Sequence, residues 1–319
     1  MLKFDILNIL IKSLLYLCLI LTLQQNQIMK PKLLILVSIF SFLMINCSKK
    51  DVDNTTITSD EAKMNAQMDI AIDDVGRLVE EQFETTIATG SGKSNITTAT
   101  SLPACATMVR VPAVGTTPAV GSTVTKIIDF GSTGCELANG NILRGKIALS
   151  FIYNPGATSH TITYTFVDFY HNSKKINGTK TFVRTMTTAS GSSTSHPIVV
   201  MNLDMTMTAV DGRVFTRVGT RTCEITAGYD TPLTLTDNIY SVTGSWTTTY
   251  PNTIVQTSTI TSPLIVNLSC YPFNSAISQG VISYVRNTRI ATLDYGNGDC
   301  DNYAVFTYNG GSFNIYLKN

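Results

Sequence analysis

Hydrophobic and polar residues alternate along the chain after residue 123. In KIALSFIY (146–153) the apolar side chains occupy every second position, and TITYTF (161–166) repeats this pattern. Such alternation is typical of β-strands that bury one face and expose the other. Comparable runs follow near 179–187, 197–208, 213–226, 236–249, 252–267, 279–286, 289–295, 302–308 and 312–318. We predict a mainly β fold in which residues 124–319 form a long antiparallel meander, either a sandwich or a curved half-barrel sheet.

Turn-forming residues separate many of these runs. They are Asn154-Pro155-Gly156, Asn177-Gly178, Asp211-Gly212, Tyr250-Pro251-Asn252 and Asn309-Gly310-Gly311. Asn-Gly and Asp-Gly between alternating runs are strong hairpin signals, because these residues tolerate positive φ angles. Each stretch is therefore predicted to be a turn that joins two sequential strands.

A helical pattern covers residues 58–90, before the strands. Its apolar residues recur at steps of three and four, at Met64, Met68, Ala71, Ile72, Val75, Leu78, Val79 and Phe83. Thr58 and Glu61 form a capping box and Gly90 is a typical stop, which predicts a helix from about residue 59 to 88. The polar face is mostly acidic, with Glu61, Asp69, Asp73, Asp74, Glu80 and Glu81. Anionic lipids would repel such a face, so we expect this amphipathic helix to pack on the sheet.

The stretch 91–123 is rich in Gly, Ser, Thr, Ala and Pro, and is predicted to be a connecting loop. TGSGKS (89–94) resembles a phosphate-binding loop at its start. That motif needs a glycine at position 87, where Ile87 stands, and it should follow a strand and open a helix. A nucleotide site is therefore not expected here.

The N-terminal part of the chain, residues 1–46, reads as a signal region. From Met29, two lysines are followed by the apolar run Leu33 to Ile45 and then by Cys47. This order is typical of a signal peptide and resembles a bacterial lipobox, in which the cysteine is acylated, with palmitate for example, and becomes the first mature residue. Met29 is then the expected true start, since a second apolar segment precedes it. Residues 47–57 would form a lipidated tether.

The remaining cysteines suggest disulfide bonds. Cys105 and Cys135 are 30 residues apart, and so are Cys270 and Cys300. IIDFGSTGC (127–135) and TLDYGNGDC (292–300) end in similar turns, which indicates one turn type used twice or an internal duplication. In an oxidising compartment the natural pairs are 105–135 and 270–300. Cys223 is left over and is expected to be a buried thiol in a strand.

Composition and motifs argue against several kinds of chemistry. Charged residues make up 14% of the chain with a net charge of +1, against about 25% charged in average proteins, so nucleic acid is not an expected partner. The cysteines lack the close spacing of a metal site, and DYGNGDCDN (294–302) does not match a calcium loop. His160, His171 and His196 form no catalytic motif. We predict no metal, no cofactor and no enzyme activity.

Two further groups of residues each have a functional and a structural interpretation. Asp168, Asp204, Asp211 and Asp294 would support a glycan hydrolase only if they converged in space. Tyr164, Phe166, Tyr170, Tyr240 and Trp246 would bind sugars on an exposed face but belong to the core on a buried one. The core is the expected place for these aromatic side chains.

Several segments together resemble a known group of proteins. They are CSKKD, AIDDVGRLVEE, IIDFGSTGC, SPLIVNLSCYPF and ATLDYGNGDCDNYAVFTYNGG, in this order along the chain. They are similar to uncharacterised cell-envelope lipoproteins of flavobacterial type, from Bacteroidota, over most of residues 47–319. The resemblance implies an envelope lipoprotein of mainly β structure and no particular activity. Cys223 departs from the group.

From these observations we expect a lipoprotein of the cell envelope, anchored in the outer membrane through Cys47 and either periplasmic or surface-exposed. We expect it to be a non-catalytic binding or structural module with a protein, glycan or lipid ligand. A carrier of lipid or another apolar ligand in a half-barrel is the alternative, and a glycan-acting hydrolase is a second alternative.

Overall fold

The computed structural model describes residues 56–90, 102–188, 194–231, 235–271 and 274–317. The signal region, Met29 and Cys47 lie outside these residues, as do most of the tether and the first part of 91–123. Residues 54–319 form one compact unit. Within the described parts of the chain, no helix has the length and apolar character needed to cross a membrane.

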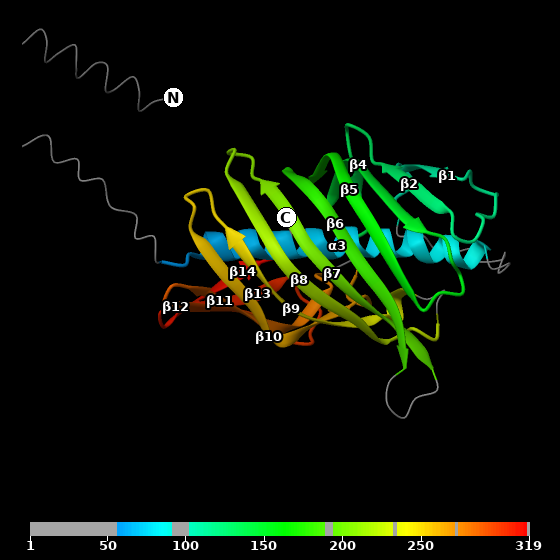
Figure 1. The fold of residues 1–319 in the computed structure, drawn as a ribbon. Coiled ribbons are helices and arrows are strands. Elements are labelled where there is room, and N and C mark those ends of the chain that lie inside the picture. The colour runs from blue at the N-terminus through cyan, green and yellow to red at the C-terminus, as the bar shows by residue number, and fades with distance from the viewer. Residues whose placement is uncertain (1–55, 91–101, 189–193, 232–234, 272–273, 318–319) are drawn as a thin grey trace, which may run out of the picture. The chain divides into compact units, whose positions relative to one another are not determined.

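The described strands form one open antiparallel sheet of fourteen strands (Figure 1). They are β1 (Thr107–Val111), β2 (Thr123–Asp129), β3 (Cys135–Glu136), β4 (Ile142–Ile152), β5 (Ser159–His171), β6 (Lys174–Thr188), β7 (Ser195–Thr208), β8 (Val214–Ala227), β9 (Ile239–Thr249), β10 (Val255–Asn267), β11 (Ile277–Arg286), β12 (Arg289–Asn297), β13 (Tyr303–Tyr308) and β14 (Gly311–Tyr316). A short 3₁₀ turn, η1 (Leu235–Asp237), precedes β9. Each strand lies beside the next one along the chain, except that β2 pairs with β4 and the two-residue β3 pairs with β4 off this path. The predicted meander is confirmed, as an open sheet and not a sandwich.

The stretch predicted as a connecting loop contains one strand. β1 lies within residues 91–123 and pairs antiparallel with β2, with Val109 opposite Ile127. Its five residues, TMVRV, alternate too briefly to stand out from the Pro- and Gly-rich sequence around them. Pairing along the free edge of β2 supplies the hydrogen bonds that this short segment could not satisfy alone.

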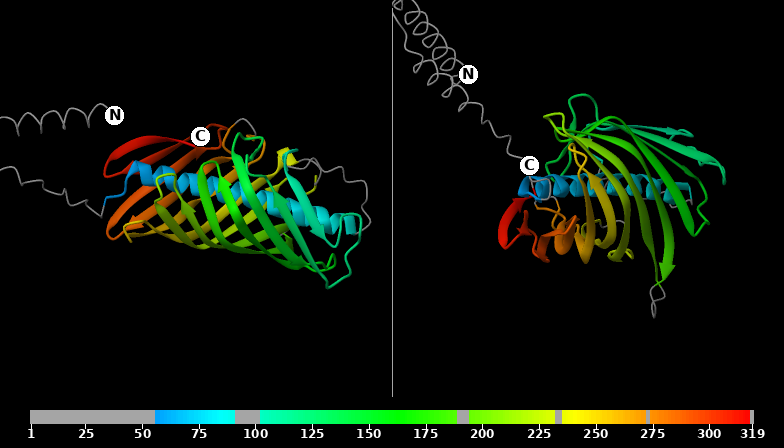
Figure 2. Two further views of the ribbon diagram at one scale, coloured as in Figure 1. Left: turned by 90° about the horizontal axis from the view of Figure 1, so that it is seen from above. Right: turned by 60° about the vertical axis from the view of Figure 1, so that its left-hand side comes forward.

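The predicted helix is α3 (Ser59–Gly90). Its capping box forms as expected: Glu61 N donates to Thr58 Oγ1 at 3.2 Å, and Thr58 N donates to Glu61 Oε2 at 3.0 Å. Figure 2 shows the sheet curving around α3, which lies along the concave face. Side chains of α3 contact strands from β2 to β12, because Lys126 and Tyr295 both hydrogen bond to helix residues. The sheet therefore wraps the helix instead of stacking on one side of it.

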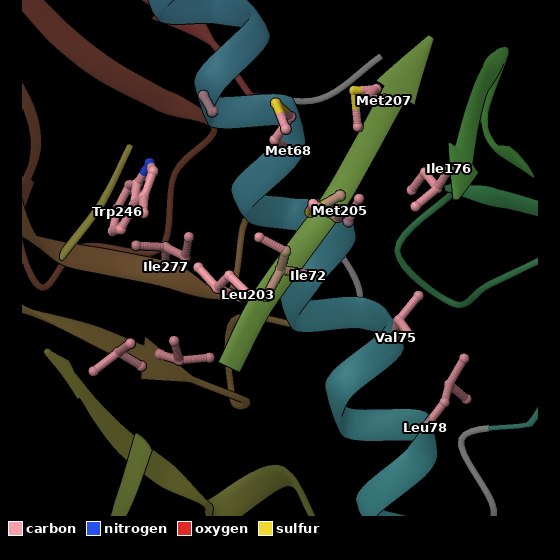
Figure 3. Packing of buried hydrophobic residues seen from close by; sticks show 14 of the residues in the cluster. Met68, Ile72, Val75, Leu78, Ile176, Leu203, Met205, Met207, Trp246 and Ile277 are labelled. Atoms are coloured by element: carbon pink, nitrogen blue, oxygen red, sulfur yellow. The ribbon is translucent and has the colours of Figure 1, made fainter. Parts of the chain in front are cut away.

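The apolar stripe of α3 fills the centre of the concave face. Met68, Ile72, Val75 and Leu78 are each no more than 1% exposed. Figure 3 shows them among side chains of the strands, labelled Ile176, Leu203, Met205, Met207, Trp246 and Ile277. Burying one such side chain contributes about 1.5–3 kcal/mol. The core thus depends on the helix as much as on the sheet.

One predicted hairpin turn is wrong. Asn177-Gly178 lies inside β6, and the chain turns instead at Asn172, which has a φ of 55°. Gly178 is required for a different reason: a Cβ at this position would lie 2.3 Å from the carbonyl oxygen of Asp204 on β7. The glycine allows two strands to approach closely at an irregular point of the sheet.

The two predicted cysteine pairs lie at disulfide distance. The Cα atoms of Cys105 and Cys135 are 5.8 Å apart, and those of Cys270 and Cys300 are 5.1 Å apart. The segment before the second cysteine of each pair contains the same local hydrogen bond, because the Asp129 and Asp294 carboxylates each accept a hydrogen bond from the N–H two residues later, at 2.9 Å. The similarity of the two segments in sequence thus extends to this local hydrogen bond.

Peptide mapping of the unreduced protein should recover the 105–135 and 270–300 links, with Cys223 as a free thiol. Each link should stabilise the fold by about 3–4 kcal/mol through the lost entropy of the unfolded chain. Alkylation before and after reduction, followed by mass spectrometry, measures the pairing. Recovery of free thiols at these four positions in the folded protein would contradict this prediction.

Candidate binding site

The acidic face of α3 meets basic side chains on the concave face of the sheet. Asp69, on α3, has a side chain with no exposed surface. Arg217 Nη1 and Arg221 Nη2, both on β8, donate hydrogen bonds to Asp69 Oδ1. Trp246 on β9 packs on both guanidinium groups, whose Cζ atoms lie 4.8 and 4.3 Å from the ring centroid. We call Asp69, Arg217, Arg221 and Trp246 the Asp69 cluster.

Neighbouring polar groups extend the Asp69 cluster. Arg217 Nη2 donates to Asn65 Oδ1 at 2.8 Å, and Asn65 Nδ2 donates to the Tyr250 hydroxyl at 2.8 Å. A buried charge is tolerated only when it is paired and hydrogen bonded. The cluster therefore fixes the position of α3 within the sheet.

Asp74 forms a second buried network one turn further along α3. Its carboxylate accepts hydrogen bonds from Asn139 Nδ2 at 2.9 Å, Asn141 Nδ2 at 2.8 Å and His171 Nε2 at 2.9 Å, and from Arg77 Nη2 at 3.3 Å. Burial raises the pKa of Asp74, but the hydrogen bond and charge of His171 and the other donors outweigh this effect, so the pKa lies below its ordinary value. Asp74 is an anion with every acceptor position used.

Ion pairs of the same polarity continue toward both ends of α3. Arg184 on β6 bonds to Glu84, and Arg286 Nη2 on β11 lies 3.0 Å from Glu61 Oε1. The Lys126 ammonium on β2 donates to the Gln82 carbonyl oxygen at 2.5 Å. Acidic groups on the helix thus face basic groups on the sheet along most of its length.

These buried basic residues were not predicted, although the sequence holds a signal for them. Arg217 and Arg221 stand two and six positions after Phe215, so strand alternation places all three on one face. Phe215 is buried, and the two arginines are buried with it. Inward-pointing arginines opposite an acidic helix indicate ion pairs across the core, which a search for catalytic motifs overlooks.

A cavity of about 90 Å³ lies between α3 and the strands β6 to β10. Its apolar wall consists of Phe182, Val199, Met201, Val242, Val266 and Leu268. The helix contributes Asp73, Gly76, Arg77 and Glu80, which lie on one face at steps of three and four. An apolar hollow with a few converging polar groups is the usual form of a ligand site. We call it the α3 cavity.

Two of the three carboxyl groups that line the α3 cavity, those of Asp73 and Glu80, are incompletely paired. Asp73 Oδ1 is 3.7 Å from Arg221 Nη1, and Glu80 Oε1 is 3.8 Å from Arg184 Nε. Burial is the main cause that raises the pKa of each carboxyl to about 7. Their side chains keep 27% and 21% of their surface exposed, so both remain accessible from the cavity.

Cys223 and Tyr240 form another part of the cavity wall. Cys223 is the free cysteine of the described residues, and it lies in a strand, β8, as predicted, although it is half buried and not buried. Burial, with the nearby Glu80 and Asp73, raises its thiol pKa well above the ordinary value. A thiol that stays protonated is a poor nucleophile, so Cys223 is suited to packing and not to covalent chemistry.

A smaller polar cavity of about 40 Å³ adjoins the α3 cavity, and the two share Asp73, Asp74 and Ala276 as lining residues. Its other walls include Asn139, Asn274 and Asn302. Asn302 Nδ2 donates to Asn274 Oδ1 at 2.8 Å, and Asn139 Nδ2 donates to Asp74 Oδ1 at 2.9 Å. This cavity has room for a few water molecules.

The residues considered for a hydrolase lie apart from these cavities. Asp168, Asp204, Asp211 and Asp294 are exposed, and none of them lines either cavity. Asp168 binds Lys175 and Asp211 binds Arg213. Among the described residues, no group of three or more His, Cys, Asp and Glu side chains is placed to hold a metal ion.

The histidines and aromatic residues are mainly structural. His160 Nε2 bonds to the Asn154 carbonyl oxygen at 2.8 Å, and His196 Nε2 bonds to Glu224 Oε1 at 2.8 Å. Tyr164 and Trp246 are buried, as expected for core side chains. The other aromatic residues under consideration are half buried, namely Phe166, Tyr170 and Tyr240.

Lys180 on β6 gives the fold a dependence on pH. Burial lowers the pKa of its ammonium to about 7, with Arg221 and Arg217 acting in the same direction. Between about pH 7 and 10, Lys180 is protonated in the unfolded chain but largely deprotonated in the folded protein. The unfolded state therefore binds more protons, so this group makes the free energy of unfolding rise with pH. In Lys180→Met this slope should be smaller by up to about 1.4 kcal/mol per pH unit. Urea unfolding at several pH values measures the slope, and equal slopes in both proteins would contradict the prediction.

Comparison with protein-family models, with curated proteins and with solved structures finds no match for this chain.

Proposed function

We propose that this chain is a lipoprotein of the cell envelope, held in the outer membrane by acyl chains on Cys47, whose β domain binds a small ligand without transforming it. The α3 cavity is the observation that carries the binding role, because an apolar wall and converging polar groups suit a ligand. The order of lysines, apolar run and cysteine supports the anchor. We also propose that the chain is one of the Bacteroidota envelope lipoproteins that it resembles in sequence.

The anchor is tested in cells that express the full chain. Metabolic labelling with an alkyne-bearing palmitate should mark the wild type and place it in the membrane fraction. Cys47→Ala should lose the label, whereas Cys18→Ala, which changes a cysteine in the earlier apolar segment, should keep it. A labelled Cys47→Ala protein would overturn this part of the proposal.

The binding role is tested with a variant that fills the α3 cavity. Gly76 lines the cavity, and a Cβ there meets only the flexible end of Met201, at 3.2 Å. Gly76→Leu should fill the cavity while it gains about 1 kcal/mol of helix propensity. Full-length protein purified from membranes should carry an extractable small molecule that Gly76→Leu lacks, as measured by mass spectrometry. Identical extracts from the two folded proteins would count against a ligand site here.

The carrier of an apolar ligand is a second candidate, and the apolar wall of the cavity is the observation that favours it. The concave face that such a carrier would use is occupied by α3 and holds the Asp69 cluster. A carrier would therefore have to displace the helix or use the α3 cavity alone. A membrane lipid in the extract would favour the carrier over a module that binds a soluble ligand.

A further inference from the structure

The charges around the α3 cavity indicate the chemical class of its ligand. We propose that the cavity binds a linear alkyl diamine, with its methylene chain against the apolar wall and its two ammonium groups at Asp73 and Glu80. This inference rests on the proposed function and adds the nature of the ligand. Nothing in the predicted motifs pointed to it.

The two arginines of the cavity wall donate their hydrogen bonds to acids other than Asp73 and Glu80. Arg77 bonds to Asp74, and its guanidinium Cζ lies 4.3 Å from the ring centroid of Tyr271. Arg221 donates its hydrogen bond to Asp69 and not to Asp73. Arg221 Nη1, which is buried, has no hydrogen-bond partner. The nearest cation therefore leaves Asp73 with charge that a ligand ammonium could neutralise.

Glu80, like Asp73, lacks a closely paired cation. Arg184 approaches it at 3.8 Å, but Arg184 Nη2 bonds to Glu84 much more closely. Glu84, one turn further along α3, repels the negative charge of Glu80. The Cys223 thiol and Tyr240 line the same cavity. Glu80 thus has no hydrogen-bonded cation of its own among the described residues.

The groups facing Asp73 come from three elements. Asp69 and Asp74 on α3 repel its negative charge, while Arg221 on β8 and Lys180 on β6 attract it. The attraction does not compensate for burial, so the pKa of Asp73, like that of Glu80, stays near 7. Both carboxyls would become fully ionised on meeting a cation, which makes binding of a dication favourable above neutral pH.

The spacing and size of the site suit two charges joined by a short chain. Asp73 and Glu80 are seven residues apart on one helix face, which is about 10 Å along the helix axis. The cavity volume of about 90 Å³ is below the roughly 150 Å³ of a cavity that holds benzene. The site therefore takes a slender methylene chain and no ring.

The experiment measures binding of 1,5-diaminopentane to the full-length protein by calorimetry at about pH 8, where both carboxyls are ionised. The diamine should bind at least ~10-fold more tightly than n-pentylamine or 1,5-pentanediol, because each lost charge pair costs on the order of one pKa unit of interaction. Asp73→Asn and Glu80→Gln should each reduce diamine affinity ~10-fold. Asp60→Asn, on the exposed first turn of α3, should leave the affinity unchanged.

The outcomes separate this inference from the proposed function. Equal affinity for diamine and diol, or for diamine and monoamine, would overturn the diamine assignment. Failure of diamine to bind, together with an extractable molecule that Gly76→Leu lacks, would overturn the ligand class and leave the proposed function standing. Weaker diamine binding at about pH 5.5 than at pH 8 would support the role of the two carboxyls.

Discussion

Replacing Asp69 with alanine should lower the free energy of unfolding by about 3–5 kcal/mol, more than any other single change on the acidic face of α3. The substitution leaves the Arg217 and Arg221 guanidinium groups buried without the carboxylate that they share. An unpaired buried charge is far more costly than the lost contact itself. Urea denaturation followed by circular dichroism measures the loss.

Two further variants test whether the unpaired buried charge causes this loss of stability. Asp60→Ala removes an acid from the exposed first turn of the same helix, and it should cost less than about 1 kcal/mol. The triple variant Asp69→Leu, Arg217→Met, Arg221→Met removes the whole ion network, and it should be within about 2 kcal/mol of the wild type or more stable. A triple variant as unstable as Asp69→Ala would show that packing, and not the unpaired charge, causes the loss.

Substituting Gly178 with alanine should cost about 3 kcal/mol or more. Gly178 has a φ of 129°, and the added Cβ would meet the carbonyl oxygen of Asp204 at 2.3 Å and the Cα of Met205 at 3.1 Å. Backbone strain contributes about 1–3 kcal/mol, and the steric overlap between β6 and β7 adds a similar amount. Thermal unfolding of the two proteins measures the difference.

Gly212→Ala is the matched control. Gly212 also has a positive φ, of 83°, but a Cβ there has nothing within 4 Å. It should therefore show the conformational cost alone, about 1 kcal/mol. Equal losses in the two variants would mean that the close contact across β6 and β7 is relieved at no cost.

The strands were predictable because each one alternates over many residues. β8, for example, was predicted at 213–226 and spans Val214–Ala227. The capping box and the terminal glycine placed α3 within two residues at its C-terminal end. Local sequence patterns suffice to predict the strands and their order where each strand pairs with its neighbour in sequence.

The misreading of Asn177-Gly178 shows where local patterns fail. A glycine in a strand and a glycine in a turn look alike in sequence, and only the nearby backbone of Asp204 distinguishes them. The short strand β1 was missed for a related reason, since it is defined by its pairing with β2. Both features depend on what lies beside the segment in space.

The candidate site was harder to predict because its parts are far apart along the chain. Asp69 is 148 residues from Arg217, and Asp73 meets side chains of β6 and β8 only when the sheet closes around the helix. The acidic helix face and the arginines among buried strand positions were both visible. Their partnership follows from the curvature of the sheet, which no short window of sequence reveals.

The enclosure of α3 also has a consequence for the order of assembly. The helix is made before all of the described strands, yet partners such as Arg286 and Tyr295 are made more than two hundred residues later. The hairpins between them can form one after another, because strands that are neighbours in sequence pair with each other. Until the final strands are made, Asp69 and the apolar stripe are only partly covered, so the newly synthesised chain should depend on a holding chaperone until its C-terminal third has been made.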